Sequence, residues 1–147
     1  MRETVPRILA VDWGERRIGL AVSDPQGIIA TGLETLVVRG NADALARIAA
    51  IASEREVERI VVGLPLLMSG ERGEAAENAQ RFADALAART GLAVDTYDER
   101  LTSALSERRL REVGTRRGRS RGRVDQGAAV ALLESYLLRA RAHGRKD

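Results

Sequence analysis

The spacing of apolar residues predicts three strands at the start of the chain. Residues 7–12 (RILAVD), 16–23 (RRIGLAVS) and 28–38 (IIATGLETLVV) are short runs rich in branched apolar side chains, which is typical of strands. A glycine turn at Gly14 follows the first run, and a Pro- and Gly-containing turn (DPQG, residues 24–27) follows the second. Because the connections are tight, we expect these three strands to be antiparallel neighbours.

From residue 41 onward the period changes to that of amphipathic helices alternating with short strands. A first helix is expected to be capped by Asn41 and to bury a face made of Ala44, Leu45, Ile48 and Ile51. A second helix is expected over 74–90, closed by Gly91, with a buried face of Ala75, Ala79, Phe82, Ala83 and Leu86. The apolar runs at 59–63 (RIVVG) and 92–98 predict two further strands.

Two more helices are predicted after the fifth strand. One starts at Thr102 or Ser103 and reaches about Val113, and the last runs from Val124 to about Arg141. The order βββαβαβαα predicts an α/β fold in which a mixed five-stranded sheet, its first three strands antiparallel, has helices packed on it. The length of 147 residues fits a single domain spanning 1–147.

Composition excludes several kinds of chemistry. The chain has no cysteine, and its single histidine, His143, lies near the C-terminus. A thiolate nucleophile, a cysteine-ligated zinc and a Ser-His-Asp triad are therefore excluded. No apolar stretch is long enough to span a membrane and no signal peptide is evident, so we expect a cytoplasmic protein with no membrane partner.

Basic residues are concentrated in the last third of the chain. Residues 1–99 carry a net charge of −5 and residues 100–147 carry +8, and all basic residues but Lys146 are arginine. Residues 114–123 (GTRRGRSRGR) show no hydrophobic period and are expected to form a mobile basic loop, and residues 142–147 form a basic tail. Since arginine pairs bidentately with phosphate, this asymmetry favours a nucleic-acid partner. The candidate nucleic-acid-binding residues are Arg16, Arg100, Arg116, Arg117, Arg119, Arg121 and Arg123.

Carboxylates follow two of the predicted strands. Asp12 ends the first strand, and Asp98 and Glu99 end the fifth. The carboxyl ends of strands are where open α/β sheets bind ligands. Because successive side chains of a strand point to opposite faces, only one of Asp98 and Glu99 can share a cleft with Asp12. The other should pair with an arginine or cap a helix, and the residues alone do not decide between the two.

A further acid, Asp125, is expected in the first turn of the last helix. It shares the apolar face of that helix with Ala129, Leu132, Leu133 and Tyr136, which favours an orientation toward the sheet. Compensation of the helix dipole is the alternative explanation for an acid at this place. Three converging carboxylates would repel one another, and Mg²⁺ or Mn²⁺, which bind oxygen ligands, would neutralise them. Carboxylate-bound metal pairs carry out phosphoryl transfer, so the acids and the basic loop together predict a nuclease.

Four motifs in order resemble the YqgF/RuvX family. They are Asp12-x-Gly14 with Gly19-Leu20-Ala21-x-Ser23-Asp24, then Gly63-Leu64-Pro65, Asp98-Glu99-Arg100-Leu101-Thr102, and Val124-Asp125-x-x-Ala128-Ala129, covering about residues 7–140. The resemblance implies an RNase H-like fold and metal-binding, catalytic acids at Asp12, Asp125 and one of the Asp98–Glu99 pair. Within that pair the family pattern favours Glu99. The basic position before the last acid, often lysine in this family, is filled by Arg121 or Arg123.

The resemblance also implies a function: a two-metal hydrolase that processes the 5′ end of pre-16S rRNA during ribosome biogenesis. One alternative is a resolvase of four-way DNA junctions with the same acids, for which a homodimer would be expected. Another is an RNA-binding ribosome assembly factor without catalysis, in which the basic loop would suffice. We interpret Trp13 as packing at the rim of the site, with base stacking as the alternative.

Overall fold

The computed structural model describes residues 5–102 and 121–144, and in the second range it describes the side chains of residues 127–142. Its sheet has five strands in the spatial order β3-β2-β1-β4-β5. Strands β1 (Ile8–Asp12), β2 (Arg17–Ser23) and β3 (Ala30–Val37) are antiparallel neighbours. Strands β4 (Arg59–Leu64) and β5 (Ala93–Asp98) run parallel to β1. The predicted mixed sheet is therefore confirmed.

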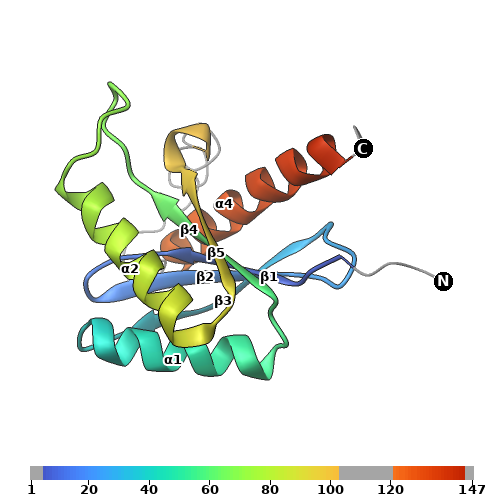
Figure 1. Ribbon diagram of the computed structural model, residues 1–147, viewed down its shortest axis with the longest axis horizontal. Helices are drawn as coiled ribbons and strands as arrows, with labels where there is room; N and C mark the ends of the chain where they lie inside the picture. Colours follow the sequence, from blue (N-terminus) through green and yellow to red (C-terminus); the bar gives the residue numbers. More distant parts are fainter. Residues whose placement is uncertain (1–4, 103–120, 145–147) are drawn as a thin grey trace.

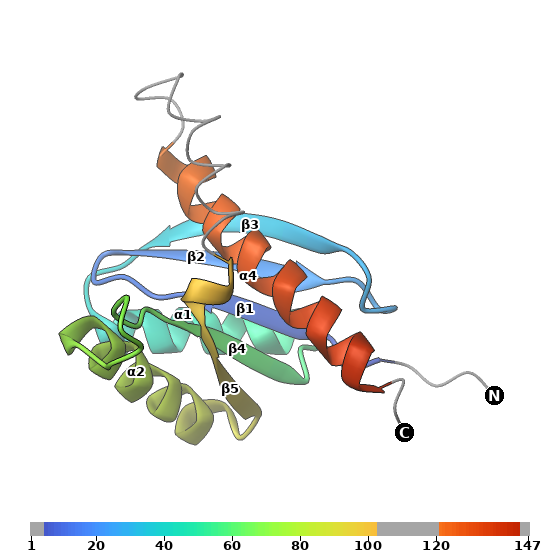
Figure 2. The same ribbon diagram turned by 90° about the horizontal axis from the view of Figure 1, so that it is seen from above.

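Helices cover both faces of this sheet. Helices α1 (Asn41–Glu54) and α2 (Glu74–Thr90) lie on one face, and α4 (Arg121–Gly144) lies on the other (Figure 1). Seen from above, α4 crosses the strands obliquely and contacts β1, β2 and β3 (Figure 2). A short 3-10 helix, η1 (Glu99–Thr102), follows β5 directly.

The central strand β1 is buried on both faces, as its unbroken apolar sequence predicts. Leu9 and Val11 pack in the core beneath α1 and α2, whereas Ile8 and Ala10 pack in the core beneath α4. Odd and even positions of β1 therefore belong to different layers, and this alternation decides which layer each residue at the end of the strand faces.

The turn between β2 and β3 is stabilised by an aspartate. Oδ1 of Asp24 accepts hydrogen bonds from the backbone N–H groups of Ile28 and Ile29 at 2.7 and 2.8 Å. These bonds favour the ionised carboxylate, and the bond from Ile29 contributes most to a lowered pKa of Asp24. The buried Ser23 hydroxyl accepts a bond from the Ile8 N–H at 2.8 Å and joins β2 to the start of β1.

Several element boundaries and helix faces differ from the sequence-based prediction. The N-cap of α1 is Gly40, because the side chain of Asn41 accepts a hydrogen bond from Trp13 instead of capping the helix. In α2 the buried small residue of the first turn is Ala76, whereas Ala75 is exposed. Helix α4 begins at Arg121, three residues before the predicted start, so the end of the predicted basic loop is helical. The predicted helix over 102–113 lies outside the described residues, apart from Thr102 at the end of η1.

Where the structure describes the chain, none of its helices combines the length and the apolar character needed to cross a membrane.

Candidate active site

The site is built at the edge of the sheet where β1, β4 and β5 end. These three strands are parallel, so their carboxyl ends lie at the same edge. The register aligns Val11 of β1 with Val62 of β4, and the next residue of β4, Gly63, with Tyr97 of β5. In this register Asp12, which follows Val11, and Tyr97 lie on either side of Gly63, and Asp98 aligns with Leu64. Open α/β sheets bind their ligands at such an edge.

Strand alternation places Asp12 on the face covered by α4. Ala10 and Ile8, two and four residues earlier, belong to the core beneath that helix. Asp12 continues their row and is partly exposed where the strand ends. The next residue, Trp13, packs instead against the core beneath α1 and α2. A carboxylate and an aromatic ring thus lie on opposite sides of one strand end.

Glu99 approaches Asp12 from the end of β5. Tyr97 packs in the core beneath α4, and Glu99 follows two residues later as the first residue of η1. The carboxyl groups of Glu99 and Asp12 interact across the end of β4, and this interaction lowers the pKa of Glu99. Of the predicted acids, the structure therefore brings Asp12 and Glu99 together.

Gly63 makes this contact possible. A Cβ atom at Gly63 would lie 3.0 Å from Cγ of Glu99 and 3.1 Å from its Cδ and Oε1. Such distances are tighter than nine in ten real Cβ contacts. The missing side chain thus leaves room for the Glu99 carboxyl group to pass over β4. Sequence reasoning used Gly63 as part of a motif but assigned it no role. The sequence did carry a signal, because a glycine in a strand often marks a place where another group approaches the backbone closely.

The contact between the two carboxyl groups requires a proton in the absence of a cation, because two ionised carboxylates have no hydrogen to share. Burial raises the pKa of the Glu99 carboxyl group above its ordinary value of 4.5, and the negative charge of nearby Asp98 raises this pKa further. The hydrogen bond with Asp12 acts in the opposite direction. Glu99 therefore holds its proton to a higher pH than an ordinary glutamate.

Asp98 has a different partner. Its Oδ2 accepts a hydrogen bond from Nη2 of Arg100 at 2.7 Å, and its Oδ1 accepts one from the Arg100 backbone N–H at 2.9 Å. The Arg100 side chain is the largest cause of a lowered pKa of Asp98, so Asp98 ionises at a lower pH than Glu99. We predicted that one of the two acids would pair with an arginine or cap a helix, and Asp98 does both at the start of η1.

The remaining predicted site residues are Asp125 and the arginines. Asp125 lies in α4, but its side chain is among those not described, as are the side chains of Arg121 and Arg123. The predicted binding residues Arg116, Arg117 and Arg119 also lie outside the described residues. Arg16 is exposed beside the β1–β2 turn, and the guanidinium group of Arg100 is engaged by Asp98. The binding roles of these arginines remain predictions.

The residues present fit a hard divalent cation. Asp12 and Glu99 offer oxygen atoms only, and their mutual repulsion is relieved either by the shared proton or by a cation that replaces it. Within the described part of the chain, no group of three or more acidic or histidine side chains could hold a metal.

Residues 6–139 match the family described as "RuvX: Holliday junction resolvase". A protein of Chloroflexus aurantiacus named "Putative pre-16S rRNA nuclease" is 47% identical over 130 residues, covering 88% of this chain and 85% of its own. A protein of Anaeromyxobacter dehalogenans with the same name is 47% identical over 131 residues, covering 89% and 96%.

Solved structures share the fold at low sequence identity. RuvC of T. thermophilus in complex with a Holliday junction substrate has a TM-score of 0.66 and 18% identity, covering 94% of this chain and 96% of that one. The fowlpox virus Holliday junction resolvase has a TM-score of 0.55 and 11% identity, covering 90% and 99%.

Sheet order, helix placement and these neighbours define an α/β protein with the RNase H-like fold of resolvases. The matches in sequence are long and specific, and they support the activity of a nuclease. This chain belongs to the RuvX family.

Proposed function

We propose that this protein is a divalent-metal-dependent nuclease that hydrolyses phosphodiester bonds of RNA and processes the 5′ end of pre-16S rRNA. The observation that carries the proposal is the contact between the Asp12 and Glu99 carboxyl groups at the carboxyl edge of the sheet. Relatives that are 47% identical and named as pre-16S rRNA nucleases support the choice of substrate.

In this proposal Asp12, Glu99 and Asp125 hold Mg²⁺ or Mn²⁺. Asp125 is included on its position in the sequence, one helical turn before Ala129, which is buried against the sheet. A bound metal pair would supply an activated water and would stabilise the leaving oxygen. The protein's own part is to hold its carboxylates in place and to keep Glu99 ready to release its proton.

The neighbouring residues orient the acids. Arg100 fixes Asp98 and so holds the first turn of η1, from which Glu99 projects. Gly63 leaves room for the glutamate over β4. The arginines of residues 114–123 would bind the phosphate backbone, because arginine forms paired hydrogen bonds with phosphate oxygens.

Asp12→Asn tests the proposal. It preserves size but removes one ligand charge, so cleavage of a 5′-extended rRNA precursor should fall by at least about 100-fold in Mg²⁺ or Mn²⁺, whereas RNA affinity and folding should change little. Asp84→Asn, an exposed acid on α2, is the matched control and should cleave like the wild type. Cleavage by Asp12→Asn at the wild-type rate, or undiminished cleavage in EDTA, would refute the assignment.

A resolvase acting on four-way DNA is the second candidate, favoured because the matching family is described as a Holliday junction resolvase. It requires two symmetric cuts and therefore a C2 dimer. A DNA junction in the same assay, with sedimentation analysis of the protein, separates the two. Paired nicks by a dimer would assign the resolvase, and RNA cleavage by a monomer would assign the proposed function. Binding of both substrates without cleavage would favour a non-catalytic assembly factor.

A further inference from the structure

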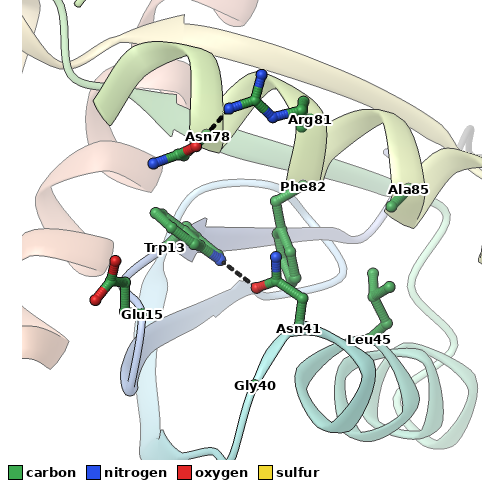
Figure 3. Close-up of a pocket in the computed structure, with 9 residues that line it drawn as sticks. All are labelled: Trp13, Glu15, Gly40, Asn41, Leu45, Asn78, Arg81, Phe82 and Ala85. Carbon is green, nitrogen blue, oxygen red and sulfur yellow. Dashed lines mark hydrogen bonds between the residues drawn. The ribbon is translucent and has the colours of Figure 1, made fainter. Parts of the chain in front are cut away.

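A cavity lies next to the candidate active site, on the opposite side of the same strand end. It has a volume of about 390 Å³ and opens between the start of α1, the middle of α2 and the β1–β2 turn (Figure 3). Trp13, which follows Asp12 directly, forms one wall, and Phe82 and Leu45 form the apolar floor. This volume lies within the range of small-molecule sites.

Two asparagines flank the tryptophan with a defined orientation. Oδ1 of Asn41 accepts a hydrogen bond from the Trp13 indole N–H at 3.2 Å, and Oδ1 of Asn78 accepts one from Nη2 of Arg81 at 2.6 Å. Indole and guanidinium nitrogens only donate, so in each asparagine the oxygen must face its partner. The amide NH₂ groups therefore point away from these partners, that of Asn78 near the Trp13 ring and that of Asn41 beyond the indole N–H edge (Figure 3). The cavity thus offers two amide donors beside an aromatic face.

The charges at the rim suit a neutral ligand. Arg81 and Glu15 both line the cavity and both are exposed, so the wall carries one positive and one negative side chain. A carboxylate disfavours a phosphate group, whereas it can accept a hydrogen bond from an exocyclic amine. An aromatic face, donors and one acceptor together match a nucleobase, which has a π-face, ring-nitrogen or carbonyl acceptors and, in most bases, an amino group.

The position of the cavity links it to the acids. Asp12 and Trp13 are consecutive, so their Cα atoms are about 3.8 Å apart, and their side chains point to opposite sides of the strand end. A strand whose scissile phosphate lies at Asp12 and Glu99 can cross this edge and place a neighbouring base against Trp13. We propose that this cavity binds one unpaired nucleobase of the substrate strand, next to the bond that is cut. The inference rests on the proposed function insofar as it takes nucleic acid as the substrate.

The protein carries its own reporter for a test, because Trp13 is its single tryptophan. A single-stranded RNA of about twelve nucleotides is titrated into wild type in EDTA and into Asp12→Asn in Mg²⁺, so that no cleavage occurs. Tryptophan emission reports the cavity, and the anisotropy of labelled RNA reports total binding. The expected result is saturable quenching. A series of RNAs carries one abasic nucleotide at each position in turn. The abasic site at the position that would occupy the cavity should abolish the quenching and weaken binding by about 5- to 100-fold, the effect of losing one stacked base.

Two substitutions test which cavity residues bind the base, and both leave the packing of Trp13 in place. Asn78→Ala and Arg81→Ala should each weaken the quenching titration several-fold. Arg89→Ala, which removes an exposed arginine about two turns further along α2, is the matched control and should change nothing. Three results would overturn the proposal. They are unchanged tryptophan emission while anisotropy shows binding, equal affinity for every abasic RNA, and failure of RNA to bind at all. The nuclease proposal is judged separately, by metal-dependent cleavage that Asp12→Asn removes.

Discussion

At the scale of single residues, two adjacent acids have opposite environments. Glu99 is half-buried against Asp12 and has a raised pKa, whereas Asp98 is paired with Arg100 and has a lowered one. Strand alternation could predict that the two acids diverge, but not which of them meets Asp12. In the structure Glu99 lies over Gly63 and interacts with Asp12, whereas Asp98 is held by Arg100.

The two acids should therefore respond differently to neutralisation. Glu99→Gln removes a proposed metal ligand, so cleavage should fall by at least about 100-fold, while the melting temperature should change little because the neutral amide replaces a carboxyl group whose raised pKa already favours the neutral form. Asp98→Asn should lower cleavage only by roughly 10-fold, and it should cost no more than about 1 kcal/mol of stability, since its ion pair is partly exposed. Cleavage assays and thermal unfolding of both variants test this, and the reverse order of activities would assign the metal to Asp98.

The raised pKa of Glu99 also predicts how metal affinity depends on pH. In the folded protein this carboxyl group keeps its proton above its ordinary value of 4.5, so the resulting contribution to stability is present at low pH and is lost as pH rises through the raised pKa. A divalent cation must displace the proton. Mg²⁺ or Mn²⁺ binding should therefore weaken as pH falls through that pKa and should release protons there.

Calorimetric titration in two buffers of different ionisation enthalpy measures the released protons. Wild type should release them, and the number should decline as pH rises past the raised pKa. Glu99→Gln should bind the cation with little dependence on pH in this range. Equal proton release by both proteins would show that the linked proton resides elsewhere.

At the scale of elements, the site depends on strands being in register. Gly63 of β4 lies between the ends of β1 and β5, and its missing side chain is what lets the two acids meet. Its backbone carries no positive φ, so alanine fits the strand itself. The added methyl group would push the Glu99 carboxyl group by a few tenths of an ångström.

Gly63→Ala should therefore lower cleavage by about 10- to 100-fold and leave the melting temperature nearly unchanged, because misplaced catalytic groups lose rate steeply. Gly63→Ala in the Glu99→Gln background provides the control, because the effects of two substitutions that act through one contact are not additive. In that background Gly63→Ala should cause no further loss of cleavage. A full additional loss would show that Gly63 acts on something other than Glu99.

The elements with a regular spacing of apolar residues were predicted most accurately from the sequence. Helix α2 and its left-handed cap at Gly91 match the sequence-based bounds, because seventeen residues of regular spacing end in a glycine. The N-cap of α1 was predicted wrongly because a tertiary partner, Trp13, competes for the Asn41 side chain. The start of α4 was missed because arginine and glycine at 121–123 carry no apolar period. Contacts such as Glu99 with Asp12 could not be predicted from local pattern, since they require the register of three strands.

At the scale of the whole molecule, charge is distributed unequally along the chain. The described strands β1–β5 and helices α1 and α2 belong to residues 1–99, with a net charge of −5, and residues 100–147 carry +8. Nucleic acid should therefore be bound mainly by the C-terminal third. That part includes α4, which crosses the same face of the sheet that Asp12 and Glu99 occupy.

Replacing Arg116, Arg117 and Arg119 by alanine should weaken RNA binding and reduce the slope of log affinity against log salt. Each lost phosphate contact lowers that slope by about 0.7–0.9. The matched triple replacement of Arg47, Arg55 and Arg89, all exposed arginines of the N-terminal part, should leave the slope unchanged. Equal slopes for the two triple variants would remove residues 114–123 from the binding surface.

The wide separation of the paired acids along the sequence has a consequence for biosynthesis. Asp12 lies on a strand whose antiparallel neighbours follow at once, but Glu99 is separated from it by more than half of the chain. During translation the β1–β3 meander can form while β4 and β5 are still unmade, because local pairings close first. A nascent chain therefore holds one acid without its partner. For an enzyme proposed to cut ribosomal RNA, this order of assembly would delay hydrolytic competence until Glu99 has been synthesised and β5 has joined the sheet.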